Sequence, residues 1–512
     1  MNSAMNSAMN NAMNNAMNNE FMSSNDIRHE FSVAMSAMYQ KEVPLYGDLI
    51  DLVTEVNSEV LDSQPDIKAQ LEHTGDIDRL SMERHGAIRL GTADELSMIR
   101  RLFAVMGMYP VGYYDLVPAG VPVHSTAFRA IDSSSLNKSP FRVFTSLLRL
   151  DLIGNKALKQ EATAALANRH IFTDKAINLI EHFETQGGLT TAEGKNFVLE
   201  ALETFRWHDK TPISKELYGR LSSQHGFIAD VVGFRGPHIN HLTPRTLDID
   251  AVQQGMQTRG IPPKAIIEGP PRRACPILLR QTSFKALKEA VNFENKAGSS
   301  EINGFEQGHH TARFGEIEQR GVALTSKGRA LYDKLLSDAR SQLNASPNED
   351  NAAEYYQILE KTFEAFPDDY QSLHEAELAY FYYEFIDNSN ASPKAIDLAV
   401  TDAKLNDSKQ ALTNLISQGV IRIEPIVYED FLPVSAAGIF QSNLYQDKGD
   451  DSESSLGSSS QDNSERNSSQ QAFEQALGTS VYDELTLYEN MQSQSLNSCF
   501  FAMKKYIDSK LI

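Results

Sequence analysis

The feature that most constrains the fold of this 512-residue chain is a short motif, His-x-x-x-Arg, that two distant segments share in a similar sequence context. The first copy is His85/Arg89 in "ERHGAIRLG", and the second is His241/Arg245 in "NHLTPRTLD". Alternate side chains of a β-strand point to the same face, so His85 and Arg89 share one face of a predicted strand. The repeat indicates either coincidence or a duplicated structural module.

The sequence after the first copy favours a helix followed by three strands. Thr92 and Glu95 have the spacing of a capping box that opens a helix, and Gly107 marks the end of that helix. Three strand-like runs follow, separated by Pro, Gly or Ser, at residues 109–116, 123–131 and 142–153. The first module is therefore predicted to be β-α-β-β-β.

The sequence after the second copy has the same order. A short helix is predicted to begin near Asp248 and to end at Gly260. Three strand-like runs come next, at residues 263–269, 276–282 and 313–324. Duplication explains this order better than chance does. We therefore predict an α+β fold in which two β-α-β-β-β modules form a partly open barrel around a metal, surrounded by helices.

Composition excludes several classes of partner. The chain carries 47 Lys+Arg against 68 Asp+Glu, and its formal charge of −21 repels nucleic acid and anionic membranes. No apolar run approaches the roughly 20 residues that a membrane helix needs. Cys275 and Cys499 are too few for a disulfide framework or a thiolate metal site, and such usage is typical of a reducing cytoplasm. We expect a cytoplasmic protein without a nucleic-acid or membrane partner.

Local composition predicts four parts of the chain. Residues 1–24 contain repeats of an MN-rich unit and are predicted to be a disordered leader. Residues 25–446 are predicted to form one catalytic, metal-binding domain with helical insertions, among them aromatic-rich helices at 352–366 and 372–386. The Ser-rich stretch 447–471 is predicted to be a disordered insertion, because it has almost no apolar side chains to bury. Residues 472–512 are predicted to be helical and to pack on the catalytic domain.

The two motif histidines and a nearby carboxylate make a candidate metal site. His241 corresponds to His85 in the repeat, whereas His238 points to the opposite face of its strand. "FGEIEQR" offers Glu316 and Glu318 on one strand face as the third ligand. Two imidazoles and one carboxylate suit Fe(II) in oxygen-using enzymes, although zinc or manganese would also bind. The alternative is structural: hydrogen-bonded strand histidines, with both glutamates paired to an arginine, Arg320.

The remaining histidines are better explained without a metal. His309 and His310 follow a Gly- and Ser-containing stretch, which favours a solvated loop. His208 lies beside Trp207, the only tryptophan, and is predicted to be part of a packed aromatic corner. His374 falls within a predicted scaffold helix, where a structural role is expected.

Arg89 is a candidate for binding a substrate carboxylate. It lies four residues from His85 on the same strand face, roughly 13 Å along the backbone. That span fits a small dicarboxylic acid whose other end is held by the metal, and guanidinium binds carboxylate through two hydrogen bonds. The alternative is a surface arginine paired with a neighbouring acid. Arg245 follows Pro244, which bends the chain, so a structural role is predicted for it.

Four strings resemble one known family, the 2-oxoadipate dioxygenase/decarboxylases, bacterial relatives of the vicinal oxygen chelate enzymes. They are "RHGAIRLGT", "GPHINHLTPRTLDID", "FGEIEQRGVALTSKGR" and "LPVSAAGIFQSNL". The resemblance extends from about Asn25 to the C-terminus, except for the Ser-rich insertion.

The resemblance implies a complete set of site residues. It implies Fe(2+) held by His85, His241 and Glu316, with Glu318 as the alternative third ligand. It also implies that Arg89 binds the substrate carboxylate. The loop that holds Val434 and Ser435 resembles the family segment that closes on the substrate, although a tight packing turn explains its small residues equally well.

The function implied is oxidation of 2-oxoadipate by O2 to 2-hydroxyglutarate and CO2, in lysine catabolism. Two other classes use the same features. A metal-dependent isomerase or lyase of the same fold would turn over without oxygen, with zinc or nickel. A non-catalytic sensor would bind 2-oxo acids without turnover, but nothing in the sequence resembles the DNA-binding or phosphoacceptor module such a sensor normally carries.

Overall fold

The computed structural model describes residues 21–294, 305–343, 347–387, 396, 409–432 and 463–510. Contacts divide the chain into two compact units. Unit 1 consists of Met1–Lys264, Thr282–Glu318 and Phe431–Tyr482, and unit 2 of Ala265–Gln281, Gln319–Asp430 and Asp483–Ile512.

A seven-stranded mixed sheet, curled into a half-barrel, joins the two predicted modules. Its strand order is β3-β4-β5-β2-β8-β12-β9, so four strands of the first module lie beside three of the second. The predicted α+β class with a partly open barrel is confirmed. The strands are β2 (Arg84–Leu90), β3 (Tyr109–Asp115), β4 (Val123–Arg129), β5 (Arg142–Leu148), β8 (His241–Pro244), β9 (Leu279–Ser283) and β12 (Phe314–Arg320).

The pairing of β2 with β8 brings the two motif copies together. The strands are antiparallel, with His85 opposite Thr243 and Gly86 opposite Leu242. β12 runs parallel to β8, with Phe314 beside His241. Because paired residues point to the same face, the motif histidines and the glutamates of β12 share one face of the sheet.

The first module has the predicted elements. Helix α6 (Ala93–Val105) begins at Thr92, whose hydroxyl accepts from the Glu95 amide at 3.2 Å. The Glu95 carboxylate accepts instead from the Gly91 amide at 2.8 Å, so only half of the predicted capping box forms. Strand β5 is shorter than predicted, because residues 150–152 form a 3-10 helix.

The second module differs from the prediction in two places. Helix α13 (Ile249–Thr258) begins at Asp248 as predicted. Residues 263–269 form isolated bridges rather than a strand, since prolines at both ends of this segment remove backbone donors. Between β9 and β12 the chain forms a hairpin, β10 (Lys288–Glu294) and β11 (Phe305–Thr311), that was not predicted.

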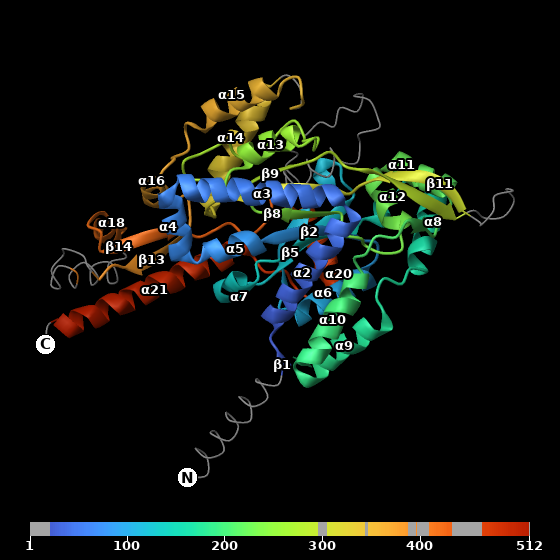
Figure 1. Cartoon of the computed structure of the whole chain (residues 1–512), viewed down its shortest axis with the longest axis horizontal. Helices are drawn as coiled ribbons and strands as arrows, with labels where there is room; N and C mark the ends of the chain where they lie inside the picture. Colours follow the sequence, from blue (N-terminus) through green and yellow to red (C-terminus); the bar gives the residue numbers. More distant parts are fainter. Residues whose placement is uncertain are drawn as a thin grey trace, which may run out of the picture. The chain divides into compact units, whose positions relative to one another are not determined.

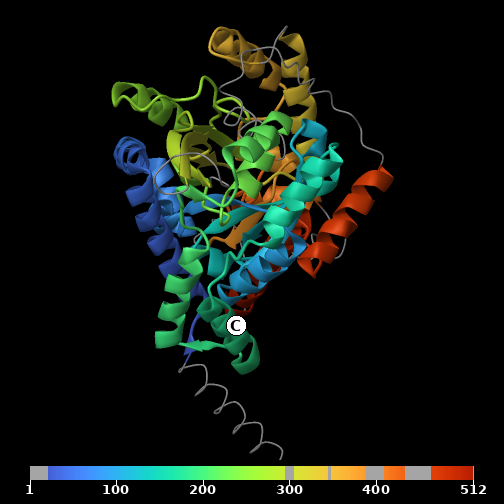
Figure 2. The same cartoon turned by 90° about the vertical axis from the view of Figure 1, so that its right-hand side faces the viewer.

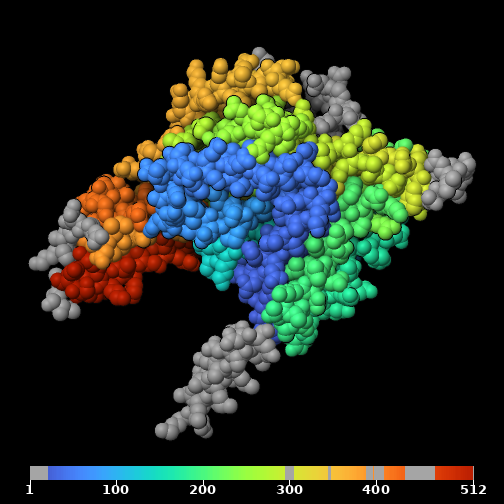
Figure 3. Space-filling model, in the orientation of Figure 1, coloured from blue at the N-terminus to red at the C-terminus, as the bar shows by residue number. Residues whose placement is uncertain are grey.

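Helices α2 (Ser24–Glu42) and α3 (Pro44–Ser63) cover the face of the sheet opposite the motif histidines. They lie in front of the strands in Figure 1, and Figure 3 shows their atoms covering this side of unit 1. The Tyr39 hydroxyl lies 2.8 Å from the carbonyl oxygens of both Asn240 and Phe314. Leu49 packs on the same side, close to Gly315 of β12.

The other helices of unit 1 surround these strands, as Figure 2 shows from the side. None of the described helices is long and apolar enough to cross a membrane. The remaining elements of unit 1 are α4 (Pro65–Thr74), α5 (Asp76–Met82), α7 (Ser133–Lys138), α8 (Lys156–Ala167), α9 (Asp174–Gln186), α10 (Thr191–Glu203), α11 (Lys215–Gln224), α12 (Gly226–Gly233), α20 (Asn463–Leu477), β1 (Phe21–Met22), β6 (Leu189–Thr190) and β7 (Lys210–Thr211).

Unit 2 has its own core between helices and a two-stranded sheet. The predicted aromatic helix at 352–366 is confirmed as α15, but 372–386 is not one helix. It forms the end of α16 and strand β13, in which aromatic side chains are favoured. The elements are α14 (Ser326–Gln342), α15 (Ala352–Phe363), α16 (Tyr370–Glu375), β13 (Phe381–Phe385), α18 (Lys409–Ser417), β14 (Ile421–Pro425) and α21 (Glu484–Lys510).

The Ser-rich stretch 447–471 is only partly within the described chain. Residues 463–471 belong to helix α20, where we expected no ordered structure. The reason lies just beyond the polar stretch, because Phe473 and Leu477 are fully buried and anchor this helix in unit 1. The leader and residues 447–462 lie outside the described residues.

Replacing Gly315 by alanine should destabilise the protein through overpacking. An added Cβ would clash with the Phe284 ring and lie 2.8 Å from a Leu49 methyl. We expect the free energy of unfolding to fall by about 1–3 kcal/mol in urea titrations followed by circular dichroism. Gly47→Ala is the control: it lies in α3 with nothing within 4 Å of the new Cβ and should leave stability unchanged or slightly raised. Equal stability of the two variants would contradict the prediction.

Candidate metal centre

Three residues predicted as ligands lie together on one face of the sheet. We call His85, His241 and Glu316 the His85 cluster. The Nε2 atom of His85 lies 3.3 Å from Glu316 Oε1, and that of His241 lies 3.5 Å from Glu316 Oε2. All three are at least 95 % buried, and their candidate ligand atoms lie within 4.8 Å of one another. The group could hold a metal ion.

The spacing within the His85 cluster fits a shared metal. Metal bonds of about 2.0–2.2 Å hold neighbouring ligand atoms about 3.0–3.5 Å apart, whereas a charged hydrogen bond brings them to about 2.7–2.9 Å. The two Nε2 distances to Glu316 fall in the first range. The donor set, two imidazoles and a carboxylate, is one that iron, zinc and manganese accept.

Glu318 lies on the other side of the His85 ring. Its Oε2 atom is 2.8 Å from Nδ1 of His85, a hydrogen-bond distance, and its Oε1 atom is 3.3 Å from Nη1 of Arg142. Glu316 and Glu318 therefore meet different nitrogens of one imidazole. A carboxylate on Nδ1 fixes the tautomer and leaves Nε2 to bind the metal.

The electrostatics of the two imidazoles differ. Burial alone would lower the pKa of His85, but the carboxylates of Glu318 and Glu316 outweigh it and the pKa is raised. Burial, with the positive charges of His85 and Arg89, holds the pKa of His241 well below its usual range. The carboxylates thus favour the charged form of the His85 imidazole, whereas the His241 imidazole stays neutral.

Aromatic rings border the cluster. The Phe431 ring lies 4.9 Å from that of His85 and 5.1 Å from that of Phe144. Phe314, the residue paired with His241 across the sheet, stacks on the His241 ring at 4.8 Å. These apolar contacts restrict the rotation of both imidazoles and limit the access of water.

A buried network of ion pairs contacts the His85 cluster through Glu318. Glu83 is fully buried, and its carboxylate accepts hydrogen bonds from Nη2 of Arg142 at 2.5 Å and from Nη1 of Arg245 at 3.0 Å. Arg142 in turn contacts Glu318, which contacts His85. The second motif arginine therefore belongs to this network.

Arg89, the first motif arginine, lies in a different environment. Its Nη1 atom is 2.5 Å from Oδ2 of Asp230, and its guanidinium carbon is 4.6 Å from the centre of the Phe227 ring. Both partners belong to α12. Burial and the charge of Arg89 lower the pKa of the neighbouring His225 to about 4. Arg89 is 2 % exposed, so it is not the surface arginine of the alternative interpretation, although it does pair with an acid as that interpretation expected.

A second buried group surrounds Asp230. We call Asp230, His238 and His310 the Asp230 cluster. The Oδ1 atom of Asp230 lies 2.8 Å from Nε2 of His310 and 3.4 Å from Nε2 of His238. The prediction of a solvated loop at His309 and His310 is wrong: both lie on strand β11, and His310 is buried while His309 is exposed. Alternation across Gly308, His309 and His310 was the signal that could have revealed this strand.

The remaining predicted positions are scattered. Trp207 packs against Phe234 at 5.0 Å, as the predicted aromatic corner requires, while His208 is half-buried. His374 lies 3.0 Å from the Tyr383 hydroxyl within unit 2. Val434 and Ser435 lie outside the described residues.

Comparisons with known proteins agree with one another. The model of the family described as 2-oxoadipate dioxygenase/decarboxylase matches residues 31–443. A relative of that name from Pseudomonas putida is 55 % identical over 484 residues, covering 94 % of this chain and 98 % of the relative. One from Escherichia coli is 52 % identical over 478 residues, covering 93 % and 98 %.

A solved structure is also similar over nearly the whole chain. The crystal structure of hydroxyglutarate synthase from Pseudomonas putida in complex with 2-oxoadipate has a TM-score of 0.81 and 52 % sequence identity. The match covers 95 % of this chain and 99 % of that one.

Glu83→Gln should strongly destabilise unit 1. The substitution leaves the buried guanidiniums of Arg142 and Arg245 without their shared negative charge. We expect the free energy of unfolding to fall by about 3–5 kcal/mol in urea titrations. Glu203→Gln, which breaks an exposed pair with Arg206, should change it by less than about 1 kcal/mol. A small effect at Glu83 would show that the network contributes little.

Proposed function

The chain belongs to the 2-oxoadipate dioxygenase/decarboxylase family, and from this premise we propose that it is an iron(II) enzyme that converts 2-oxoadipate and O2 to 2-hydroxyglutarate and CO2. Six carbons and seven oxygens enter and leave, so no second oxo acid is needed. The proposal includes lysine degradation as the source of the substrate. The observation that carries it is the His85 cluster, with two Nε2 atoms facing one carboxylate.

His85, His241 and Glu316 would hold the ion. A ferrous ion bound there would supply the redox chemistry that couples loss of the C1 carboxyl group as CO2 to the uptake of O2. A metal held by these three residues would keep coordination positions open for the carboxylate and keto oxygens of a 2-oxo acid. The low pKa of His241 keeps its imidazole neutral, as metal binding requires.

Glu318 and the aromatic rings would prepare the site. The Oε2 atom of Glu318 lies 2.8 Å from Nδ1 of His85 and so would direct Nε2 toward Glu316. Phe431 and Phe314 lie against the two imidazoles and keep water from this part of the site. Exclusion of water strengthens the electrostatic contacts of the substrate and protects the reaction from side products.

Arg89 would bind the far carboxylate of the substrate. It shares a sheet face with His85 and lies roughly 13 Å from it along the strand. The distance leaves room for an extended six-carbon acid between the metal ligands and the guanidinium. Binding at both ends orients the keto group at the metal.

The first test is oxygen uptake by iron-loaded protein on addition of 2-oxoadipate. We expect O2 consumption, CO2 release and 2-hydroxyglutarate formation in equal amounts. An oxygen electrode measures the first, and mass spectrometry the two products. His241→Ala should lose bound iron and fall to the background of metal-free protein. His309→Ala, an exposed histidine away from the cluster, should retain both iron and activity.

Two outcomes would contradict this function. Turnover of the oxo acid without oxygen, supported by zinc or nickel, would indicate an isomerase or lyase. Tight binding of 2-oxoadipate to the iron-loaded protein without any turnover would indicate a sensor.

Glu318→Gln should weaken metal binding while leaving the ligands in place. The amide cannot accept from His85 Nδ1 and balance Arg142 as the carboxylate does. We expect metal affinity to fall about 10–100-fold in competition with a chelator. Glu289→Gln is the matched control, since Glu289 pairs with a buried arginine, Arg313, outside the cluster. Equal affinities for the two variants would assign Glu318 a purely structural role.

A further inference from the structure

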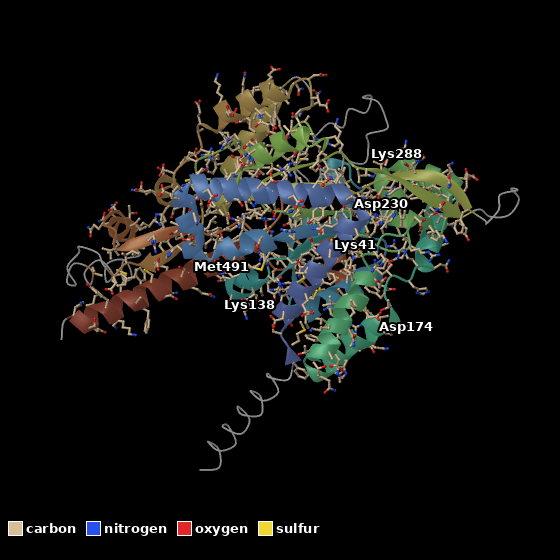
Figure 4. The ribbon with its side chains drawn as sticks, viewed as in Figure 1. Lys41, Lys138, Asp174, Asp230, Lys288 and Met491 are labelled. Carbon is tan, nitrogen blue, oxygen red and sulfur yellow. The ribbon has the colours of Figure 1, made fainter. Side chains whose placement is uncertain are left out.

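We propose that Asp230 is a positioning residue that sets Arg89 for the far carboxylate of the substrate, and that it thereby selects dicarboxylic over monocarboxylic 2-oxo acids. The inference rests on the proposed function and adds to it a residue that none of the sequence motifs indicated. Asp230 is labelled in Figure 4, near the ribbons of α12 and of the β10–β11 hairpin.

One face of α12 holds the Arg89 guanidinium. Phe227 and Asp230 are three residues apart, so their side chains lie on the same side of the helix. The Phe227 ring lies under the guanidinium carbon at 4.6 Å, and the Asp230 carboxylate contacts Nη1 at 2.5 Å. The helix therefore fixes both the plane and the direction of the guanidinium.

Asp230 is itself held by groups from other elements. Its Oδ1 atom accepts from Nε2 of His310 at 2.8 Å, while Oδ2 contacts Arg89. Nδ1 of His310 lies 2.6 Å from the Tyr218 hydroxyl of α11. His238 adds a further Nε2 atom 3.4 Å from Oδ1. Each carboxylate oxygen thus has its own partner, and the carboxylate cannot rotate without breaking one of them.

Aromatic packing fixes these two histidines. The Trp207 ring stacks on that of His310 at 6.0 Å and 15°, and meets that of His238 edge-on at 4.7 Å. Phe234 lies 4.5 Å from His310 and 5.2 Å from His238. Such packing keeps the histidines, and hence Asp230, in one arrangement before substrate arrives. Groups held in advance lose little freedom on binding, which favours affinity and orientation.

The Asp230 cluster is better explained in this way than as a second metal centre. Its His310 contact of 2.8 Å is a hydrogen bond, shorter than the 3.3 and 3.5 Å contacts in the His85 cluster, and of the two histidine contacts of its carboxylate only that of His238, at 3.4 Å, has the spacing of a shared metal. Arg89 already balances the one carboxylate, so a divalent cation would add uncompensated charge to a buried group.

The test compares two ligands that differ only at the far end. 2-Oxoadipate has a second carboxylate, and 2-oxohexanoate has the same six-carbon chain without it. For Asp230→Asn we expect Kd and KM for 2-oxoadipate to rise about 10–100-fold, with kcat changed by less than about threefold. The Kd for 2-oxohexanoate, measured anaerobically by calorimetry on metal-loaded protein, should be unchanged.

Two controls distinguish a loss of Arg89 positioning from a general loss of structure. Arg89→Lys should weaken the binding of 2-oxoadipate and not that of 2-oxohexanoate, as Asp230→Asn does, since it removes the guanidinium that Asp230 positions. Asp368→Asn removes an aspartate that pairs with an arginine of unit 2 whose side chain is buried, Arg273, and should change neither Kd. If Asp230→Asn does not fold, Asp230→Glu keeps the charge but moves it by one methylene, and should raise the Kd for 2-oxoadipate selectively.

The outcomes that overturn the inference are distinct from failure of the proposed function. Three results for Asp230→Asn would contradict the inference. They are an equal weakening of the binding of both oxo acids, an unchanged Kd for 2-oxoadipate, and a fall from two bound metals per chain to one. A wild-type protein that binds 2-oxoadipate without oxygen uptake would contradict the reaction alone. Selective loss of dicarboxylate binding in Asp230→Asn would then still support the inference.

Discussion

The antiparallel pairing of β2 with β8 is the constraint on which the rest of the structure depends. It sets His85 opposite Thr243, so that His241 lies two residues along the neighbouring strand on the same face. β12 then runs parallel to β8 and adds its glutamates to that face. A slip of one residue in either pairing would turn the histidines or the glutamates to the opposite face, which α3 covers.

The two copies of the motif place their histidines in one cluster but their arginines in two different environments. Both histidines join the His85 cluster, yet the arginines separate: Arg245 pairs with Glu83 below the cluster, and Arg89 pairs with Asp230 on α12. Duplication therefore accounts for a pair of candidate ligands related by the fold. The arginines differ in environment: Arg245 belongs to a buried ion network, whereas Arg89 contacts helix α12.

Alternation along strands, together with the repeated motif, was enough to predict the first module and a site shared by His85, His241 and a glutamate of β12. It could not distinguish the roles of Glu316 and Glu318, because both lie on one strand face and only the orientation of the His85 ring separates them. Asp230 was not predicted at all, since a single aspartate in an apolar helix has no periodic signal. The β10–β11 hairpin was missed because only two residues of each strand are buried, so the alternation at Gly308, His309 and His310 is short.

Charge balance explains why two similar buried clusters suit different tasks. The His85 cluster and its network contain four carboxylates against three guanidiniums, those of Asp76, Glu83, Glu316 and Glu318 against those of Arg79, Arg142 and Arg245. One negative charge is left over, and a bound cation would offset it in a region where water cannot. In the Asp230 cluster the single carboxylate already faces a guanidinium, and its charge makes that guanidinium costly to move. An excess of carboxylate therefore favours a metal, whereas a balanced pair favours a fixed arginine.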